Sequence, residues 1–218
     1  MKQAKQAIVI GGSKGIGRAV ATALLAAGYK VKAASSRDID TSDIRSVENF
    51  AKTYKAIDVL VLNTGGPPQK NFFDIREKDW LKYHRQLFMG FCLLLQRLKV
   101  NRSGYIFLIS SHLIKEPNET LALSFAYRLA FWGVLKSLTK HYAANDISVI
   151  NIAPGPIKTK RLQALTADMA KLEESLPFKR AGDPKEIGDF VGAIVKNRIK
   201  YLSGVTINFD GGLSKYIF

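Results

Sequence analysis

Residues 7–17 read Ala-Ile-Val-Ile-Gly-Gly-Ser-Lys-Gly-Ile-Gly. The apolar run before the first glycine predicts a buried strand, and the spacing of Ile16, Val20 and Leu24 predicts a helix that ends near Gly28. A strand, a glycine turn and a helix in this order are typical of a dinucleotide-binding unit, in which the helix N-terminus faces the pyrophosphate. A glycine turn alone is weak evidence, so the rest of the chain has to support this interpretation.

Three glycines of this turn have distinct expected roles. Gly11 permits the sharp turn, Gly15 lets a pyrophosphate approach the backbone, and Gly17 lets the helix pack closely on the strand. The predicted cofactor-binding residues of the turn are Gly11, Ser13, Lys14, Gly15, Ile16 and Gly17.

Length and composition indicate an ordinary globular protein. The 218 residues, 47% hydrophobic and 23% charged, predict a single domain spanning residues 1–218. No apolar stretch is long enough to cross a membrane, and no signal peptide is recognisable, so we expect a cytoplasmic protein. The single cysteine, Cys92, excludes an internal disulfide, and no His/Cys cluster has the spacing of a metal site.

The formal net charge of +15 has two interpretations. One is binding of nucleic acid or of an anionic ligand, and the other is a lysine-rich solvated surface. The lysines are spread along the chain and no basic run is interleaved with aromatic residues, which favours the solvated surface. Nucleic acid is therefore not an expected partner.

The end of the second predicted strand, residues 29–34, bears on the choice of cofactor. Ser35, Ser36 and Arg37 follow it, where an acidic side chain would bind the ribose 2′-hydroxyl of NAD. Serine and arginine favour the 2′-phosphate of NADP instead, and Lys14 adds a second cation. The sequence thus predicts NADP(H) in preference to NAD(H).

Further strands and helices alternate along the chain. The predicted fold class is α/β: a Rossmann-type doubly wound parallel sheet in three α/β/α layers. The remaining predicted strands are residues 57–62, 105–109, 148–152 and 204–209. Two further helices are predicted over residues 46–55 and 121–143. A long helix starts with a capping box at residues 74–77 and runs through Leu98, and a last helix is capped by Asp183.

The spacing Gly-x-x-x-Gly-x-Gly resembles that of the short-chain dehydrogenase/reductase family, although Ile10 stands where that family usually has threonine. Further segments match the family in order and spacing. They are Asn63-Thr64-Gly65, Ser110-Ser111, Asn151-x-x-Pro154-Gly155-x-Ile157-x-Thr159, Pro177-x-x-Arg180-x-Gly182-x-Pro184-x-Glu186-Ile187 and Ser203-Gly204 with Asp210-Gly211-Gly212.

The resemblance implies hydride transfer between a nicotinamide cofactor and the carbonyl or alcohol of a small-molecule substrate. It also implies a homodimer or homotetramer through the apolar long helices. The further cofactor-binding residues that it implies are Asp40, Asn63, Gly65, Arg128, Pro154, Gly155, Ile157 and Thr159.

One segment departs from the family pattern after the second strand. Only two residues separate Arg37 from Asp40, which resembles the start of the family's Asp-rich third strand end. A crossover to a parallel strand needs at least about ten residues. We therefore expect a shortened region, a truncated sheet edge and a more open adenine pocket.

The residues at the family's catalytic positions also differ from the family pattern. The family uses a serine, then a tyrosine four residues before a lysine on one helix face. The serine is kept as Ser111, but the tyrosine position falls on Ser124 and the lysine position on Arg128, while the family's helix asparagine falls on Leu87. A guanidinium does not release a proton near neutral pH, so Tyr127 and His112 are alternative proton donors, each also compatible with a purely structural role.

Two functions remain open on the sequence. The first is an NADP-dependent oxidoreductase with an altered proton-donor set, and the second is an inactive NADP-binding sensor or scaffold. The predicted lid, residues 158–178, begins with Lys158, Lys160 and Arg161. These cations indicate an anionic substrate, or alternatively contacts with the cofactor pyrophosphate.

Overall fold

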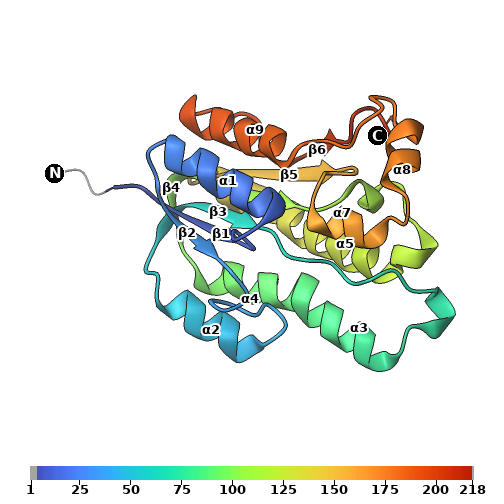
Figure 1. The fold of residues 1–218 in the computed structure, drawn as a ribbon. Coiled ribbons are helices and arrows are strands. Elements are labelled where there is room, and N and C mark those ends of the chain that lie inside the picture. Colours follow the sequence, from blue (N-terminus) through green and yellow to red (C-terminus); the bar gives the residue numbers. More distant parts are fainter. Residues whose placement is uncertain (1–3, 218) are drawn as a thin grey trace.

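The computed structural model describes residues 4–217, and these contain one six-stranded parallel sheet in the order β2-β1-β3-β4-β5-β6 (Figure 1). The strands are β1 (Gln6–Ile10), β2 (Lys30–Ala34), β3 (Ile57–Leu62), β4 (Val100–Ile109), β5 (Ser148–Pro154) and β6 (Val205–Phe209). The α-helices are α1 (Gly15–Ala26), α2 (Ile44–Lys52), α3 (Glu77–His84), α4 (Gly90–Arg97), α5 (Ala122–Ser137), α6 (Thr139–Ala143), α7 (Lys160–Leu165), α8 (Met169–Ser175) and α9 (Pro184–Lys196).

The strand order reverses at β1. The chain leaves β1 (Gln6–Ile10) toward β2 on one side and returns to β3 on the other, and all neighbouring strands run parallel. In open α/β sheets such a switch point leaves a crevice at the carboxyl ends of the strands, and ligands bind there. The predicted site residues Gly11 and Asn63 follow β1 and β3 directly, so both lie at this switch point.

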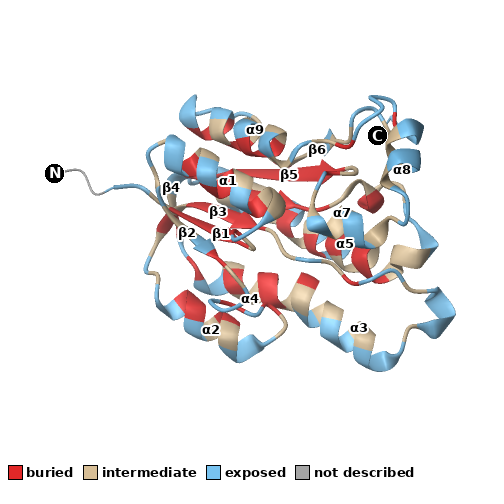
Figure 2. Cartoon of the chain, in the orientation of Figure 1, coloured by how far each residue is buried: buried red, intermediate tan, exposed pale blue. Residues whose placement is uncertain are grey.

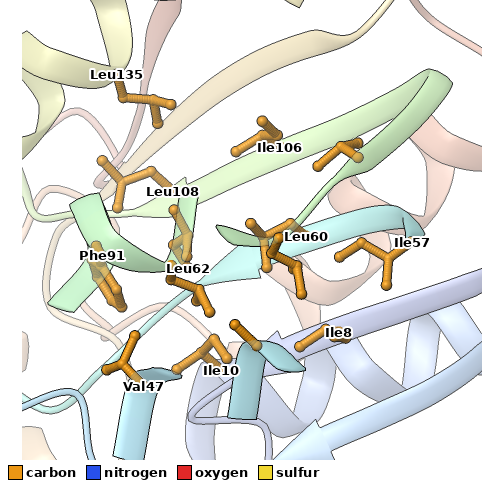
Figure 3. Close-up of a cluster of buried hydrophobic side chains, with 14 of the residues drawn as sticks. Ile8, Ile10, Val47, Ile57, Leu60, Leu62, Phe91, Ile106, Leu108 and Leu135 are labelled. Atoms are coloured by element: carbon orange, nitrogen blue, oxygen red, sulfur yellow. The ribbon is translucent and has the colours of Figure 1, made fainter. Parts of the chain in front are cut away.

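Helices cover both faces of the sheet, which gives the three predicted layers. Strand side chains alternate between the faces: Ala7 and Val9 of β1 pack with α1 and α9, whereas Ile8 and Ile10 pack with α2, α4 and α5. Figure 3 shows the second cluster, in which Phe91 of α4 and Leu135 of α5 lie over strand residues of the sheet. The central strands β1, β3, β4 and β5 and the inward helix faces are largely buried, whereas the edge strands β2 and β6 are partly exposed (Figure 2). The predicted doubly wound α/β fold is confirmed.

The shortened connection after β2 leaves that strand at the sheet edge. No strand lies between β2 and α2 in the part of the chain that the structure describes, as the spacing predicted. The connection is held against α4, because the buried Thr41 packs on Gly90 so closely that a Cβ at Gly90 would lie 2.1 Å from the Thr41 carbonyl oxygen. Asp43 then caps α2, its Oδ1 accepting from the Arg45 backbone N–H at 2.9 Å.

The helix boundaries differ from the sequence prediction in two places. Asp74 does not start the long helix: it ends a short 3₁₀ turn, η1 (Phe72–Asp74), and the extended Ile75 follows. The helix begins at Glu77, and Asp79 returns its carboxylate to the Arg76 backbone N–H at 3.2 Å. The expected box was therefore placed too early.

The two long predicted helices are also interrupted. A π-helical segment, η2 (Arg85–Met89), separates α3 from α4. The helix predicted over residues 121–143 is divided at Leu138 into α5 and α6. Apolar periodicity continues through both breaks, which explains why the pattern alone did not reveal them.

Candidate functional site

The glycine turn after β1 has the backbone geometry that its sequence requires. Gly11 and Gly15 have φ values of +64° and +54°, which side-chain-bearing residues rarely adopt. A Cβ at Gly17 would lie 2.1 Å from the Gly11 carbonyl oxygen, so only glycine lets α1 approach the strand this closely. Lys14 precedes α1 without a side-chain cap, so the first helical N–H groups have no side-chain partner there.

The residues around this turn divide into buried and exposed groups. Ile16 packs against the core beside α1, whereas Ser13 and Lys14 are exposed. Gly15 faces the segment after β5, because a Cβ there would lie 3.3 Å from Thr159 Cγ2. The turn and Thr159 therefore lie against each other at the carboxyl end of the sheet.

The end of β2 holds an acidic residue that the sequence reasoning did not single out. Asp38 forms an ion pair with Lys32 and accepts hydrogen bonds from the backbone N–H and the hydroxyl of Ser35, both at 2.8 Å. Its pKa is lowered to about 2, first by the hydrogen bond from Lys32 and then by those from Ser35. Ser36 and Arg37 are exposed beside it. The spacing Ser-x-x-Asp was the available signal.

The hydrogen bonds of Asp40 within residues 4–217 are to Ser42 and Ser46 and not to the other predicted site residues. Its Oδ1 accepts from the backbone N–H of Ser42 at 2.9 Å and from the Ser42 hydroxyl at 2.7 Å. Its own N–H donates to Ser46 Oγ at 2.9 Å. The exposed Asp40 thus shapes the short connection between β2 and α2.

Two turns meet at the switch point. Asn63, which follows β3, donates from Nδ2 to the Gly11 carbonyl at 3.3 Å. Gln86 of η2 donates from Nε2 to the Gly65 carbonyl at 2.8 Å, and this anchor was missed in the sequence. The predicted residues Gly11, Asn63 and Gly65 therefore belong to one connected structure.

At the end of β4, Ser111 begins another 3₁₀ turn, η3 (His112–Ile114), and its Oγ accepts from the Leu113 N–H at 3.3 Å. His112 lies with Nδ1 3.1 Å from the Pro154 carbonyl oxygen at the end of β5. The following Gly155 packs on Asp210, where a Cβ would lie 2.8 Å from the Asp210 Cβ.

The next cofactor-binding predictions follow β5. Ile157 is buried and forms a bridge with Gly182. Thr159 caps α7, its Oγ1 accepting from the Leu162 N–H at 3.3 Å. Pro154, Gly155, Ile157 and Thr159 hence lie along one path from β5 to α7.

Ser124 and Arg128 form a buried pair on α5. Arg128 donates from Nε to Ser124 Oγ at 3.3 Å, from Nη1 to the Ile109 carbonyl at 3.1 Å and from Nη2 to the Thr64 carbonyl at 3.0 Å. One guanidinium therefore joins α5 to the carboxyl ends of β3 and β4. Only 6% of Ser124 and 8% of Arg128 is exposed. Burial lowers the pKa of Arg128 to about 10, with a further contribution from the charge of Arg161.

A loop that sequence reasoning covered only in part passes directly over this pair. A Cβ at Gly66 would lie 3.2 Å from Arg161 Nη2, 3.3 Å from Ser124 Oγ and 3.5 Å from Arg128 Nη2. Arg161 donates from α7 to the Pro67 carbonyl. The run Gly65-Gly66-Pro67-Pro68 was the signal for an unusual turn, but its contacts come from segments far apart in the sequence.

Tyr127 has different partners. Its hydroxyl donates to the Trp80 carbonyl at 3.2 Å, and its ring packs edge-on against Trp80 and His84. Burial raises the pKa of the Tyr127 phenol. Leu87, at the asparagine position of the family, is buried in η2. The structure thus brings Ser124 and Arg128 together and directs Tyr127 toward α3.

The described residues, 4–217, contain neither a metal-ligand cluster nor a helix suited to span a membrane. No group of three or more His, Cys, Asp or Glu side chains has the arrangement of a metal site. Among those residues, no helix is both long and apolar enough to span a membrane.

The parallel sheet, its switch point and the glycine turn define a Rossmann-type nucleotide-binding protein. A model of the family described as enoyl-(acyl carrier protein) reductase matches residues 40–214. The 3-oxoacyl-[acyl-carrier-protein] reductase FabG of Staphylococcus epidermidis is 27% identical over 240 residues, covering 96% of this chain and 98% of the relative. FabG of Salmonella typhimurium is 28% identical over 238 residues, covering 97% and 98%.

Solved structures agree on the fold. A short-chain dehydrogenase of Burkholderia cenocepacia, in complex with NADP, superposes with a TM-score of 0.84 at 23% identity, covering 97% of this chain and 98% of that one. The chain belongs to the short-chain dehydrogenase/reductase family.

Proposed function

We propose that this chain is an NADP(H)-dependent oxidoreductase that interconverts a carbonyl and an alcohol, with Ser111, Ser124 and Arg128 at the reacting oxygen. The observation that carries the proposal is the buried Ser124–Arg128 hydrogen bond of 3.3 Å at the ends of β3 and β4. The proposal includes a single domain, a cytoplasmic location and a small-molecule substrate with a negative charge.

The residues at the glycine turn fit a bound dinucleotide. Gly15 and Gly17 leave the backbone free of side chains where α1 begins, and the N-terminal N–H groups of that helix have no side-chain cap. Such a helix N-terminus attracts a pyrophosphate through its N–H groups and dipole. Thr159 lies next to Gly15, and we assign it to the same part of the cofactor.

The preference for NADP(H) over NAD(H) is supported by charge. Asp38, the acidic residue near the end of β2, forms an ion pair with Lys32 and accepts two hydrogen bonds from Ser35. Arg37 and Lys14 are exposed, and neither has a carboxylate oxygen within 4.0 Å among residues 4–217. We therefore assign the 2′-phosphate to Lys14 and Arg37, since charge-assisted contacts to phosphate are the strong ones.

When bound, NADPH supplies the hydride. The hydroxyls of Ser111 and Ser124 donate hydrogen bonds to the substrate carbonyl oxygen, and the Arg128 guanidinium compensates the negative charge that develops on it. Because Arg128 is buried, little solvent screens this charge. The proton that completes the alcohol passes through the Ser124 hydroxyl, which is replenished from water.

A second candidate is an NADP-binding sensor or scaffold without turnover. It is favoured by the hydrogen-bond partners of Arg128 within the described part of the chain, which are Ser124 and two backbone carbonyls and include no phenol. Tyr127 donates to the Trp80 carbonyl instead. This candidate predicts cofactor binding without carbonyl reduction.

The two candidates are separated by measuring NADPH oxidation with a panel of aldehydes and ketones, alongside NADPH binding by tryptophan fluorescence. The oxidoreductase predicts turnover that is lost in the Arg128→Met variant at NADPH concentrations that saturate it. Binding without turnover on every carbonyl compound would support the sensor and contradict the proposed activity.

We also propose that the chain forms a homodimer or homotetramer through the outer faces of its long helices. Leu81 of α3 and Leu129 of α5 are 51% and 42% exposed. A Cβ at Gly133 of α5 would meet nothing within 4 Å, so this face can accept a close neighbour. Light scattering after size-exclusion chromatography tests this assembly: Leu129→Glu should yield monomers, and a monomeric wild-type chain would contradict it.

A further inference from the structure

Two arginine side chains lie together without an acidic partner. Among residues 4–217, neither Arg128 nor Arg161 has a carboxylate oxygen within 4.0 Å. They are close enough that the charge of Arg161 lowers the pKa of Arg128, in addition to the effect of burial. Burial lowers the pKa of Arg161 as well. A buried and a half-buried guanidinium placed together are costly unless an anion compensates their charge.

Several guanidinium donors have no protein partner in this arrangement. A guanidinium carries five N–H groups, and Arg128 uses three of them on Ser124, Ile109 and Thr64. Arg161 donates to one acceptor among the described residues, the Pro67 carbonyl. The remaining N–H groups are available to a ligand with at least two acceptor oxygens.

Gly66 marks the point where these donors converge. A Cβ at this position would lie 3.2 Å from Arg161 Nη2, 3.5 Å from Arg128 Nη2 and 3.3 Å from Ser124 Oγ. Donors from both arginines and the Ser124 hydroxyl therefore surround one short stretch of backbone, where a side chain at Gly66 would crowd them. An anion that lies against this stretch can accept hydrogen bonds from both guanidinium groups.

We infer that Arg128 and Arg161 hold a carboxylate of the substrate beside Ser124, and that the substrate is a 2-oxo acid. This inference rests on the proposed carbonyl reduction, because the carboxylate must be adjacent to the reacting carbonyl for Ser124 to reach the carbonyl oxygen. Paired guanidinium groups recognise the two oxygens of a carboxylate by parallel hydrogen bonds, which orients the group as well as binding it.

The cofactor pyrophosphate is the other source of an anion, and the position of the pair argues against it. The glycine turn lies opposite Thr159, where Gly15 and Thr159 are neighbours. Arg161 follows Thr159 by two residues, but it donates to the Pro67 carbonyl after β3. Arg128 likewise holds the ends of β3 and β4, so an anion between the two arginines lies beside the turn after β3 and not at the N-terminus of α1, where the pyrophosphate is expected.

Binding tests the inference without requiring turnover. Isothermal titration calorimetry of the NADP⁺-loaded protein compares acetate, phenylacetate and hexanoate with their neutral amides. We expect carboxylates to bind and amides to bind much more weakly. Arg161→Gln should weaken carboxylate binding by about 10- to 100-fold, the range for a hydrogen bond to a charged group, and leave NADPH affinity unchanged. Lys196→Gln, an exposed charge change on α9, should alter neither.

Steady-state kinetics with an acid and its ester provide a second test. The ratio of kcat/KM for phenylpyruvate to that for its methyl ester should fall about 10- to 100-fold in Arg161→Gln and recover in part in Arg161→Lys. Equal binding of acids and amides, or no binding by any carboxylate, would overturn the inference. A loss of NADPH affinity in Arg161→Gln equal to the loss of carboxylate affinity would assign the pair to the pyrophosphate. Carboxylate binding without any turnover would leave the anion site standing and refute the proposed activity.

Discussion

Replacing Arg128 by methionine separates catalysis from stability. Burial lowers the pKa of Arg128 from 12.5 to about 10, so the folded protein disfavours its charge by about 3 kcal/mol, which the substitution relieves. Against this, the Ile109 and Thr64 carbonyls lose their donor, at a cost of about 1–3 kcal/mol each. The net effect lies between a gain of about 1 and a loss of about 3 kcal/mol, so the free energy of unfolding should fall by no more than about 3 kcal/mol.

Turnover should respond far more strongly. Loss of a donor that stabilises a developing oxyanion lowers kcat by about 100- to 1000-fold. Urea denaturation measures the first effect, and NADPH oxidation with a carbonyl substrate measures the second. Lys136→Met is the matched control, because Lys136 lies on the same helix and donates to the Gly204 carbonyl away from the site.

Two results would refute the reasoning on Arg128. A kcat/KM within about threefold of the wild type would mean that its charge is not used at the reacting oxygen. A loss of more than about 4 kcal/mol in unfolding free energy would mean that the three hydrogen bonds outweigh the buried charge.

The remaining predictions concern the cofactor, a phenol and acid stability. Lys14→Ala and Arg37→Ala should each weaken NADPH binding about tenfold and leave NADH binding unchanged, as fluorescence titration would measure. Tyr127→Phe should cost about 1 kcal/mol of unfolding free energy through one lost hydrogen bond and leave turnover unchanged. The pKa of Glu186 is lowered from 4.5 to about 2, first by Arg180, so its stabilising contribution is present above pH 4.5 and is lost as the pH falls toward 2; Glu186→Gln should flatten that part of an acid-unfolding curve.

The control variant for the cofactor measurement lies outside the proposed site. Lys55→Ala removes an equally exposed charge beyond α2 and should not change NADPH affinity. Tighter binding of NADH than of NADPH would contradict the assignment of Lys14 and Arg37. Loss of turnover in Tyr127→Phe would make that phenol a proton donor after all, and an unchanged acid-unfolding curve in Glu186→Gln would show that the Arg180 pair does not stabilise the fold.

Local rules predicted much of the fold. The glycine spacing at Gly11 and Gly17 specified a turn and a close helix contact, because only one residue type suits those positions. The two residues between Arg37 and Asp40 were too few for a crossover, so the missing strand followed from chain length alone. The spacing of four residues placed Ser124 and Arg128 on one helix face.

Contacts between residues that are far apart in the sequence could not be predicted from these local patterns. Arg161 reaches the Pro67 carbonyl from another segment, and nothing in the local sequence specifies that partner. Asp38 looks like an acidic residue facing a cofactor, yet Lys32 on the strand before it neutralises the carboxylate. Asp74 has the spacing of a capping box, but the extended Ile75 displaces the helix start to Glu77. A partner far away in the sequence decided the position of Arg161, whereas competing local contacts decided those of Asp38 and Asp74.

The most direct measurement of the proposed activity follows the hydride itself. NADPH deuterated at C4 of the nicotinamide is incubated with the protein and a panel of carbonyl compounds that includes 2-oxo acids, and the products are examined by mass spectrometry. We predict an alcohol that carries deuterium on the former carbonyl carbon, and no labelled product with the Arg128→Met variant. Bound NADPH that transfers no deuterium to any of these compounds would contradict the account.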